Sequence, residues 1–431
     1  MKFCFSTLGC KVNQFETQAL AQLAQARGHS LIQTNADVCI INTCTVTSSG
    51  DKKTIRTIHK IQRENPNAII ALCGCFTQTE PQRALQMEGV DIVCGTSDRA
   101  AVLDLCEQEI INRKKICTVS DIRQNHEFEV LPAGVLPGHT RALLKVQDGC
   151  DNYCTYCIIP YARGHVRSLP LAEAVQQAQQ LAQNGVKEIV VTGIEIASYG
   201  RDLPQNPNLI TLTAALCQAI PNVRIRLGSL EPRIITQEFC DTLKRFDNLA
   251  LHFHLSLQSG CDDTLKRMHR RYTTKQYYVC VQRLRDAFPT CSITTDVITG
   301  FPGETEEEFI QTKTFLQKCA FSAVHVFPYS ERTGTPAASM PNSVPQQVRS
   351  QRADELRHIT AQLTQTFLSQ FVGETVCVIL EHPRADRQPA HSRWHFSITL
   401  PLGCGKQGDE IMVTLTEVHG NELYAIPCQK E

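Results

Sequence analysis

Three cysteines on one short loop are the strongest chemical signal in the chain. Cys150, Cys154 and Cys157 follow a strand-like segment with the spacing C-x3-C-x2-C, so their thiolates can converge on one iron-sulfur cluster. Three protein ligands on a four-iron cluster leave one iron open, which is what binding and reductive cleavage of S-adenosylmethionine requires. A zinc site is the alternative, but it usually has a fourth ligand at similar spacing, and the next cysteine is Cys217. The loop therefore predicts a cluster that cleaves S-adenosylmethionine.

A second group of cysteines is dispersed along the N-terminal part of the chain. Cys10, Cys44 and Cys75 each end a strand-like segment, and in a parallel sheet all three would lie at one carboxyl edge. Cys73 competes with Cys75 because it lies on the same strand face, and Cys94 also lies near a strand end. We favour Cys75 because it lies where the chain leaves the strand. The three strand ends predict a second three-cysteine cluster.

Polar residues and glycines gather in the loops that follow the later strand-like segments. Their carboxylate, amide and hydroxyl groups can bond the amino and hydroxyl groups of a ligand, and glycine lets the backbone approach it closely. The predicted cofactor-binding residues are Tyr156, Gly193, Glu195, Ser229, Gln258 and Asp296. The alternative is that the glycines and prolines there only form ordinary loops.

Local charge, rather than net charge, marks the candidate contacts with nucleic acid. The chain has 43 basic and 43 acidic residues, but residues 262–285 carry seven basic and two acidic residues, a net charge of +5. Residues 371–431 are net acidic, and there Trp394 can stack on an unpaired base without net charge. The predicted RNA-binding residues are Lys266, Arg267, Arg270, Arg271, Arg384, Arg393 and Trp394. A solvated helix face explains the basic segment equally well, and Trp394 can instead face a core.

Composition limits the class of protein. The chain of 431 residues contains 21 cysteines, too many for a reducing compartment unless some of them do chemistry. Its 42% of hydrophobic residues excludes a disordered or fibrous chain. No segment reaches the roughly 20 apolar residues of a membrane span, and the first residues lack the apolar core of a secretory signal. We therefore expect a soluble, cytoplasmic protein with several domains and no membrane partner.

The elements that position these residues predict an α/β chain with three folded regions and a linker. In residues 1–119, strand-like runs alternate with helical patterns, which predicts a parallel α/β domain. Residues 120–140 contain two prolines and two glycines without a clear period, which predicts a linker. Residues 141–370 contain six strand-helix units, two short of a full barrel, which predicts an open, partial (β/α)6 barrel. Short strands in residues 371–431 predict a small β-barrel.

The expected strands place the candidate residues at strand ends. In the central region they are expected near residues 141–147, 187–192, 223–229, 249–257, 292–299 and 322–328. In the C-terminal region they are expected at residues 375–380, 394–400, 410–417 and 422–426. In an open barrel, the loops after the strands carry the site.

The motifs themselves resemble those of the radical S-adenosylmethionine methylthiotransferases. The resemblance covers nearly the whole chain and includes both groups of cysteines. The matching blocks are TLGCKVNQFET (7–17), NTCTV (42–46), GCFTQ (74–78), QDGCDNYCTYCIIPYARGHVRS (147–168), LSLQSGCDDTLKRMHRRYTT (255–274), DVITGFPGETEEEF (296–309) and VFPYSERTGTPAA (326–338).

The resemblance implies a methylthiotransferase domain, a radical domain and a C-terminal TRAM domain in the three regions given above. It implies two 4Fe-4S clusters, an auxiliary one on the dispersed cysteines and a radical one on the loop, with S-adenosylmethionine as the further cofactor. It also implies tRNA as a partner and an electron-donor protein. The implied reaction abstracts the C2 hydrogen of an adenine and transfers to C2 a sulfur group methylated by a second S-adenosylmethionine.

The substrate branch is indicated by short motifs. Lys11, Val12 and Asn13 after Cys10, together with YSERTGTPAA (329–338), look like the branch that modifies N6-threonylcarbamoyladenosine on the 3′ side of the tRNA anticodon. The isopentenyladenosine branch usually has Gln-Met-Asn there, and the ribosomal-protein branch Pro or Ser, Lys and Asn. A methylthiotransferase with one of those substrates, and a zinc-stabilised RNA-binding protein without catalysis, remain the alternatives.

Overall fold

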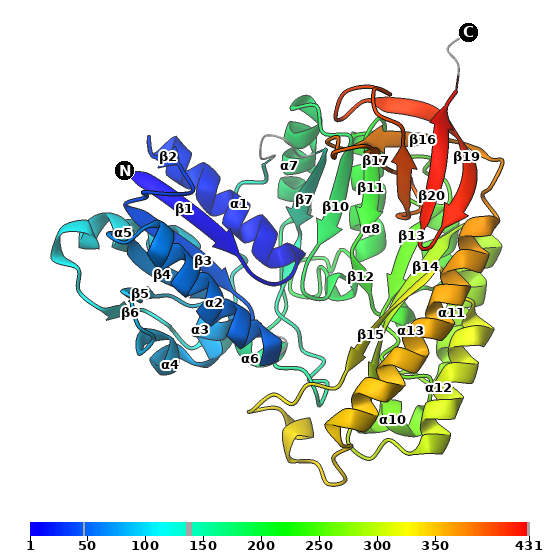
Figure 1. Ribbon diagram of the computed structural model, residues 1–431, viewed down its shortest axis with the longest axis horizontal. Helices are drawn as coiled ribbons and strands as arrows, with labels where there is room; N and C mark the ends of the chain where they lie inside the picture. The colour runs from blue at the N-terminus through cyan, green and yellow to red at the C-terminus, as the bar shows by residue number, and fades with distance from the viewer. Residues whose placement is uncertain (46–47, 135–139, 429–431) are drawn as a thin grey trace.

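The computed structural model describes residues 1–45, 48–134 and 140–428. Three bodies lie together: the N-terminal residues in blue and cyan, a central body in green and yellow, and a C-terminal barrel in orange and red (Figure 1). Residue 46 of the NTCTV block, residues 135–139 of the expected linker and residues 429–431 at the C-terminus lie outside the described residues.

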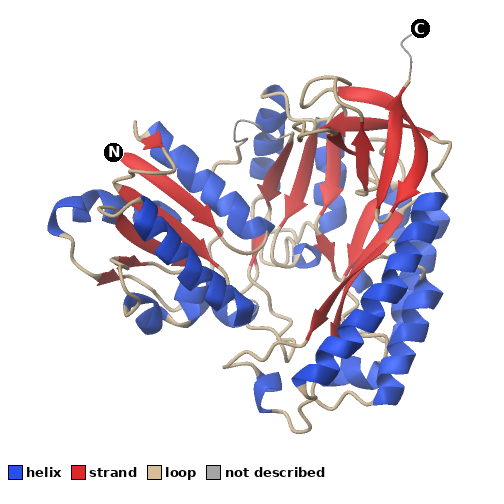
Figure 2. Cartoon of the chain, in the orientation of Figure 1, coloured by secondary structure: helices blue, strands red, loops and turns tan. Residues whose placement is uncertain are grey.

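The N-terminal body is a six-stranded, all-parallel sheet of order β2-β1-β3-β4-β5-β6. Every residue of β3 and β4 is buried, because helices cover both faces of the sheet (Figure 2). The elements are β1 (Lys2–Thr7), α1 (Lys11–Ala26), β2 (Ser30–Leu31), β3 (Val38–Thr43), α2 (Ser48–Glu64), β4 (Ile69–Gly74), α3 (Cys75–Thr79), α4 (Pro81–Leu85), β5 (Ile92–Val93), α5 (Arg99–Asn112) and β6 (Ile116–Cys117).

The central body is the partial barrel that the sequence predicts. Its parallel strands form one sheet of order β11-β10-β7 and a second of order β12-β13-β14-β15, and only Gly228 separates β11 from β12. The strands are β7 (Arg141–Lys145), β10 (Glu188–Thr192), β11 (Arg224–Leu227), β12 (Ser229–Leu230), β13 (His252–Leu255), β14 (Ser292–Thr299) and β15 (Ala323–Pro328), with β8 (Gln147–Asp148) and β9 (Arg167–Ser168) as a short antiparallel pair.

The helices of the central body pack on the outer face of these strands and leave one side open toward the N-terminal body (Figure 1). Two of them, α11 and α12, begin with complete capping boxes, at Thr273 with Gln276 and at Thr305 with Glu308. The helices are α6 (Ile159–Arg163), α7 (Leu171–Gln183), α8 (Leu209–Ala219), α9 (Gln237–Leu243), α10 (Asp262–Arg267), α11 (Thr274–Ala287), α12 (Glu306–Cys319) and α13 (Gln346–Ser369), with 3-10 turns η1 (Ile122–Gln124), η2 (Ile196–Ser198), η3 (Pro232–Ile234) and η4 (Pro336–Ser339).

The C-terminal body is a closed barrel of order β16-β17-β18-β20-β19. Its strands are β16 (Thr375–Leu380), β17 (Gln388–His391), β18 (Ser397–Leu400), β19 (Glu410–His419) and β20 (Glu422–Pro427). The expected strand 394–400 is wrong at its start, because His395 has a φ of +67° and the strand begins only at Ser397. The sequence analysis also missed β17, whose residues QPAH lack an alternating apolar pattern.

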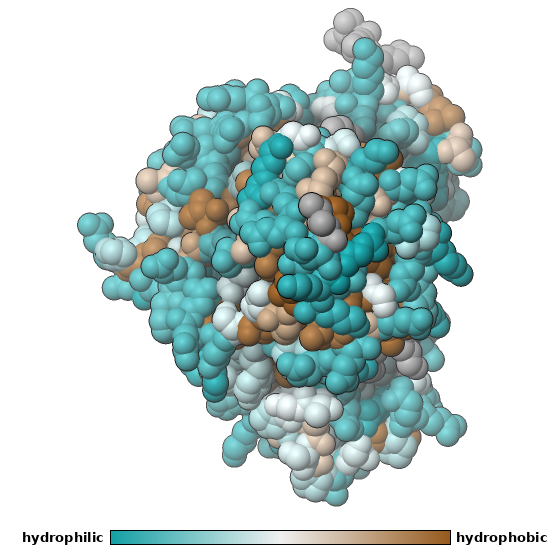
Figure 3. Space-filling model, turned by 90° about the vertical axis from the view of Figure 1, so that its left-hand side faces the viewer, coloured by the Kyte–Doolittle hydropathy of each residue, from teal (hydrophilic) through white to brown (hydrophobic). Residues whose placement is uncertain are grey.

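Among the described residues, no helix has the length and apolar character needed to cross a membrane. The face on the side of the N-terminal body is mostly hydrophilic, with smaller apolar areas between polar side chains (Figure 3).

Candidate active site

The dispersed cysteines meet at one edge of the N-terminal sheet. Cys10, Cys44 and Cys75, here called the N-terminal trio, follow the neighbouring strands β1, β3 and β4. Gly9, with a φ of +111°, permits this approach, since a Cβ atom there would lie 2.8 Å from the Cβ of Cys44. Burial raises the pKa of the Cys75 thiol to about 12, opposed by Arg163 and reinforced by the charges of Cys44 and Cys10. The three thiols are therefore within electrostatic reach of one another.

The competing cysteines lie elsewhere. Cys73 and Cys94 belong to the hydrophobic core of the N-terminal sheet. Burial raises the pKa of the Cys73 thiol far above its ordinary value, and Cys94 accepts a hydrogen bond of 3.4 Å from the hydroxyl of Thr118. The structure thus groups Cys75, and not Cys73, with Cys10 and Cys44.

The second group, here called the loop trio, consists of Cys150, Cys154 and Cys157 on the segment after β8. The N–H of Cys157 donates to the carbonyl of Cys154 at 2.9 Å, which closes the loop on itself. Burial raises the pKa of the Cys157 thiol to about 12, with added repulsion from Cys154 and Cys150. Glu195, a predicted cofactor-binding residue, adds to the rise in the pKa of Cys150 that burial causes, and so lies within electrostatic reach of the loop trio.

Each trio has its own arginine, which donates a hydrogen bond to one of the cysteine sulfurs. Arg163 donates from Nε to the Sγ of Cys75 at 3.2 Å, and Arg270 donates from Nη1 to the Sγ of Cys154 at 3.2 Å. Hydrogen bonds to cysteine sulfurs tune the reduction potential of an iron-sulfur cluster. Three neighbouring thiols with a cationic donor are a ligand set that fits such a cluster at each site. It stays a prediction that the six cysteines are the ligands of two such clusters.

A buried ionic network surrounds Arg163 and joins the N-terminal body to the central one. Glu16 of α1 is fully buried and contacts Arg163 at 2.5 Å, Arg99 at 2.8 Å and Lys145 at 2.9 Å. Lys145 also contacts Asp148 at 2.6 Å. Burial would raise the pKa of Glu16, but the three cations hold it at about 2. The network therefore stays ionised, and it positions Arg163 beside Cys75.

Sequence reasoning missed this network. Arg163 stands within the CIIPYARGHVRS segment, but no spacing rule connects it with Glu16 or with Cys75, which lie 147 and 88 residues away in the chain. The only available signal was a cluster of charged residues in a segment rich in apolar ones.

A small cavity beside the loop trio collects three of the six predicted cofactor-binding residues. Tyr156, Gln258 and Asp296 line a cavity of about 290 Å³ together with Cys157 and apolar side chains such as Phe327. The backbone of Gln258 has a φ of +71°, and its N–H donates to the carbonyl of Asp296 at 2.8 Å. A carboxylate and neutral hydrogen-bonding side chains next to a cluster site fit the amino-acid end of S-adenosylmethionine.

The other three predicted cofactor-binding residues lie outside this cavity. Gly193 follows β10 and packs closely on Gln147, since a Cβ at Gly193 would lie 2.9 Å from the carbonyl oxygen of Gln147. The side chain of Glu195 accepts from the N–H of Ala197 at 3.1 Å. Ser229 begins β12 and is exposed. The structure therefore gives Gly193 and Glu195 roles in shaping the loop beside the trio.

A larger cleft of about 820 Å³ opens between the N-terminal and central bodies. It is bordered by Thr45, which directly follows Cys44, and by Ile158, which directly follows Cys157, but none of the six cysteines is among its lining residues. On its other side Arg332 donates a hydrogen bond to the hydroxyl of Thr45 across the two bodies. The cleft is therefore bounded by residues that adjoin one cysteine of each trio.

The predicted RNA-binding residues separate into two kinds. Lys266, Arg271 and Arg384 have exposed side chains. The remaining four are engaged within the protein. Their partners are Glu308 for Arg267, Cys154 for Arg270, the carbonyls of Asp247 and Leu249 for Arg393, and Phe396 with Thr290 for Trp394.

The contacts of Arg393 and Trp394 have a physical consequence. Arg393 donates to the carbonyls of Asp247 and Leu249 at 3.2 and 3.1 Å, and the ring of Trp394 stacks on Phe396 with centroids 5.9 Å apart. Arg393 thus fastens the C-terminal barrel to the central body, as does the 3.4 Å hydrogen bond that the indole N–H of Trp394 donates to the hydroxyl of Thr290. These contacts support the inward-facing alternative for Trp394.

The comparisons with known proteins agree with this architecture. The model of the Radical SAM superfamily matches residues 144–316, and that of the Uncharacterized protein family UPF0004 matches residues 2–95. The fold is similar to that of the radical S-adenosylmethionine methyltransferase TsrM from Kitasatospora setae, with a TM-score of 0.57 at 14% identity, over 78% of this chain and 77% of that one. A partial barrel with a three-cysteine loop after its first strand defines a radical S-adenosylmethionine enzyme, a class that uses S-adenosylmethionine and a 4Fe-4S cluster.

Relatives define the family more closely. The chain is 44% identical to the threonylcarbamoyladenosine tRNA methylthiotransferase MtaB of Bacillus subtilis (strain 168), over 88% of this chain and 84% of the relative. It is 31% identical to the tRNA-2-methylthio-N(6)-dimethylallyladenosine synthase of Syntrophotalea carbinolica, over 88% of each chain. The chain belongs to the radical S-adenosylmethionine methylthiotransferase family, and it is an enzyme of that family.

Proposed function

We propose that this enzyme converts N6-threonylcarbamoyladenosine of tRNA, on the 3′ side of the anticodon, into its 2-methylthio derivative. One observation carries the proposal: four relatives with the threonylcarbamoyladenosine activity in their names are 36 to 44% identical to this chain over 87 to 89% of its length. The dimethylallyladenosine synthases reach 31 to 34%.

In this proposal the loop trio holds the radical cluster and the N-terminal trio holds a second, auxiliary 4Fe-4S cluster. When bound, the two clusters and S-adenosylmethionine supply the electron transfer, the radical, and the sulfur and methyl groups. The chain's own residues bind and orient. The cavity beside Cys157 holds S-adenosylmethionine through Gln258 and Asp296, and the adenine lies between the two trios, where the N-terminal and central bodies meet.

The partners follow from this chemistry. Reductive cleavage of S-adenosylmethionine consumes an electron, so the proposal includes an electron-donor protein, and a tRNA substrate fits a cytoplasmic location. For contact with tRNA phosphates we propose the exposed cations Lys266, Arg271 and Arg384. Arg267, Arg270 and Arg393 are left out because they have partners within the protein.

Profiling of tRNA nucleosides in cells lacking the gene tests the proposal. We expect 2-methylthio-N6-threonylcarbamoyladenosine to disappear and its unmethylthiolated precursor to accumulate, while other 2-methylthio nucleosides stay unchanged. The wild-type gene should restore the product, and a gene carrying Cys154→Ala should not.

A loss of the dimethylallyl nucleoside instead would contradict the proposal and would favour the second candidate, a dimethylallyladenosine methylthiotransferase. That candidate is supported by relatives at up to 34% identity. A change in a ribosomal protein with unchanged tRNA nucleosides would favour a protein substrate.

A further inference from the structure

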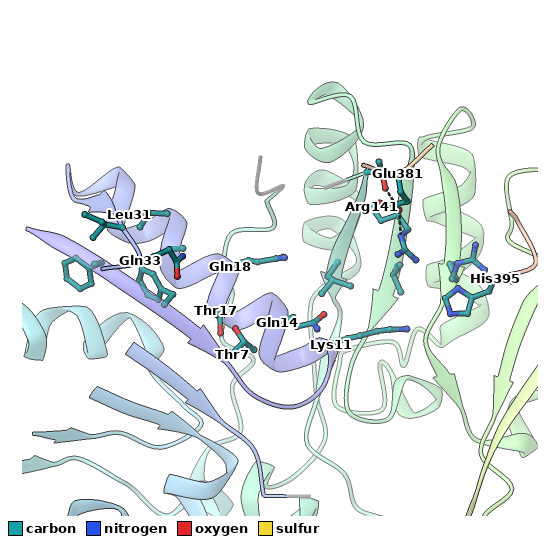
Figure 4. Close-up of a pocket in the computed structure, with 18 residues that line it drawn as sticks. Thr7, Lys11, Gln14, Thr17, Gln18, Leu31, Gln33, Arg141, Glu381 and His395 are labelled. Carbon is teal, nitrogen blue, oxygen red and sulfur yellow. Dashed lines mark hydrogen bonds and ion pairs between the residues drawn. The ribbon is translucent and has the colours of Figure 1, made fainter. Parts of the chain in front are cut away.

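A second pocket, here called the α1 pocket, lies beside α1 and is lined by residues of β1 and β2 as well as by α1 itself (Figure 4). Its volume is about 480 Å³, within the range of small-molecule sites. Its other walls come from the central strands β7, β10 and β11 and from the C-terminal barrel. Three cations, Lys11, Arg141 and Arg226, line it with a single carboxylate, Glu381. An anionic ligand would complement this lining.

Lys11 is the cation of this pocket that forms no ion pair among the described residues, although the charge of Glu188 reaches it. Arg226 forms two contacts with Glu188, at 2.7 and 2.8 Å, and Arg141 lies 3.6 Å from Glu381. Lys11 begins α1, is exposed, and extends from the helix toward the central strands (Figure 4). Its ammonium group can therefore accept a new anionic partner without breaking an existing pair.

The electrostatics confirm that these groups share one space. Desolvation, together with the nearby charges of Arg226, Lys11 and Arg141, lowers the pKa of the His395 imidazole to about 3. His395 is therefore neutral at physiological pH, and it adds neither a competing anion nor a further cation. The unmatched charge of the pocket belongs to Lys11.

The position of Lys11 relates this pocket to the reaction. Lys11 directly follows Cys10 of the N-terminal trio. In an adenine, C2 and C6 flank the same ring nitrogen, so a substituent on N6 lies close to the carbon that is modified. A threonylcarbamoyl substituent ends in a carboxylate, whereas a dimethylallyl substituent is apolar and uncharged.

We propose that Lys11, with Arg226 and Arg141 behind it, binds the threonyl carboxylate of the substrate and so selects the threonylcarbamoyl nucleoside over uncharged N6 substituents. This inference rests on the proposed function and names the residue that enforces it. A charge-assisted bond to a carboxylate is among the stronger hydrogen bonds in proteins. A substrate without the carboxylate would leave the polar groups of the site unpaired, and such a site discriminates strongly against that substrate.

Binding of anticodon stem-loops tests the inference, with no dependence on turnover. The wild-type protein should bind a stem-loop with threonylcarbamoyladenosine more tightly than one with plain adenosine. Lys11→Gln should remove about 10- to 100-fold of this preference, Lys11→Arg should retain most of it, and Lys2→Gln, an exposed lysine at the start of β1, should leave it unchanged.

A stem-loop whose threonyl carboxylate is a methyl ester completes a double-mutant cycle. The wild-type protein should lose the same factor on the ester, and Lys11→Gln should not distinguish acid from ester. Lys11→Gln could also lower the iron content, because Lys11 is next to Cys10. In that case the affinities of the wild-type protein for the acid and the ester stem-loops still show whether the carboxylate is recognised.

Two results would overturn the inference. Equal weakening of the modified and unmodified stem-loops by Lys11→Gln would mean that Lys11 binds a tRNA phosphate. An unchanged preference for the acid would mean that the carboxylate lies elsewhere. In both cases product formation by the wild-type enzyme would leave the proposed function standing, whereas no product on threonylcarbamoyladenosine tRNA would refute that function itself.

Discussion

The N-terminal trio and the loop trio are each brought together by a different route. Three parallel strands, whose ends are separated by more than 30 residues of chain, bring Cys10, Cys44 and Cys75 together. Cys154 and Cys157, by contrast, share one short loop with Cys150. The first site exists only when the N-terminal sheet is folded, whereas the second is largely specified by local spacing.

The arginines sharpen this contrast. The arginine at the N-terminal trio, Arg163, comes from the central body and is held by the buried network around Glu16. The arginine at the loop trio, Arg270, belongs to the same body as its cysteines. The N-terminal site thus depends on the packing of two bodies, and the loop site on one.

The largest effect is expected at the loop trio. Replacing Cys150, Cys154 and Cys157 by alanine should abolish cleavage of S-adenosylmethionine and remove about half of the iron, since each trio would hold one cluster. Iron analysis and 5′-deoxyadenosine formation measure the two effects. Zinc instead of iron in anaerobically prepared wild-type protein would contradict the cluster assignment.

Variants of the N-terminal trio should be blocked at a different step of the reaction. Cys75→Ala should leave cleavage of S-adenosylmethionine largely intact but stop formation of the methylthio product, because radical generation and sulfur transfer are assigned to different bodies. Cys73→Ala, in the core, is the matched control and should have a mild effect. If Cys73→Ala were inactive and Cys75→Ala active, Cys73 and not Cys75 would be the ligand.

The dependence on packing predicts a loss of stability when the network is broken. Glu16→Gln leaves three cations without their shared carboxylate, which should cost about 3–5 kcal/mol in the free energy of unfolding, measured by urea denaturation. Asp121→Asn, at an exposed pair with Arg123, is the control and should cost less than about 1 kcal/mol. Equal losses of unfolding free energy in the two variants would mean that the buried network stabilises the fold no more than an exposed ion pair does.

The same carboxylate gives a pH dependence. The folded pKa of Glu16, about 2, lies below the ordinary pKa of a glutamate, about 4.3, so ionised Glu16 stabilises the fold above that ordinary value. Its contribution should be lost as the pH falls from about 4.3 toward about 2. The stability difference between wild type and Glu16→Gln should therefore shrink over this range, and a difference that stays constant would contradict the assignment.

The smallest effects are expected at the surface. Lys266→Ala, Arg271→Ala and Arg384→Ala should each weaken tRNA binding modestly and reduce the salt slope by about one. Arg393→Ala should instead loosen the C-terminal barrel without changing that slope, because Arg393 binds backbone carbonyls. Filter binding at several salt concentrations distinguishes the two behaviours.

The sequence predicted what depends on local or periodic pattern. The loop spacing, the strand ends that carry Cys10, Cys44 and Cys75, and the six strand-helix units all follow from residue order. It did not predict the Arg163 contact with Cys75, because that contact depends on how two bodies pack. It also misplaced the strand at Trp394, since a left-handed residue at His395 leaves no signal in apolar alternation.

One measurement tests the central claim most directly. Purified protein with its clusters intact is mixed with S-adenosylmethionine, a reductant, and equal amounts of tRNA bearing threonylcarbamoyladenosine and tRNA bearing dimethylallyladenosine, and the digested nucleosides are identified by mass spectrometry. We predict that 2-methylthio-N6-threonylcarbamoyladenosine forms and that the dimethylallyl nucleoside stays unmodified. Preferential formation of the dimethylallyl product, or cleavage of S-adenosylmethionine with neither product, would contradict the claim.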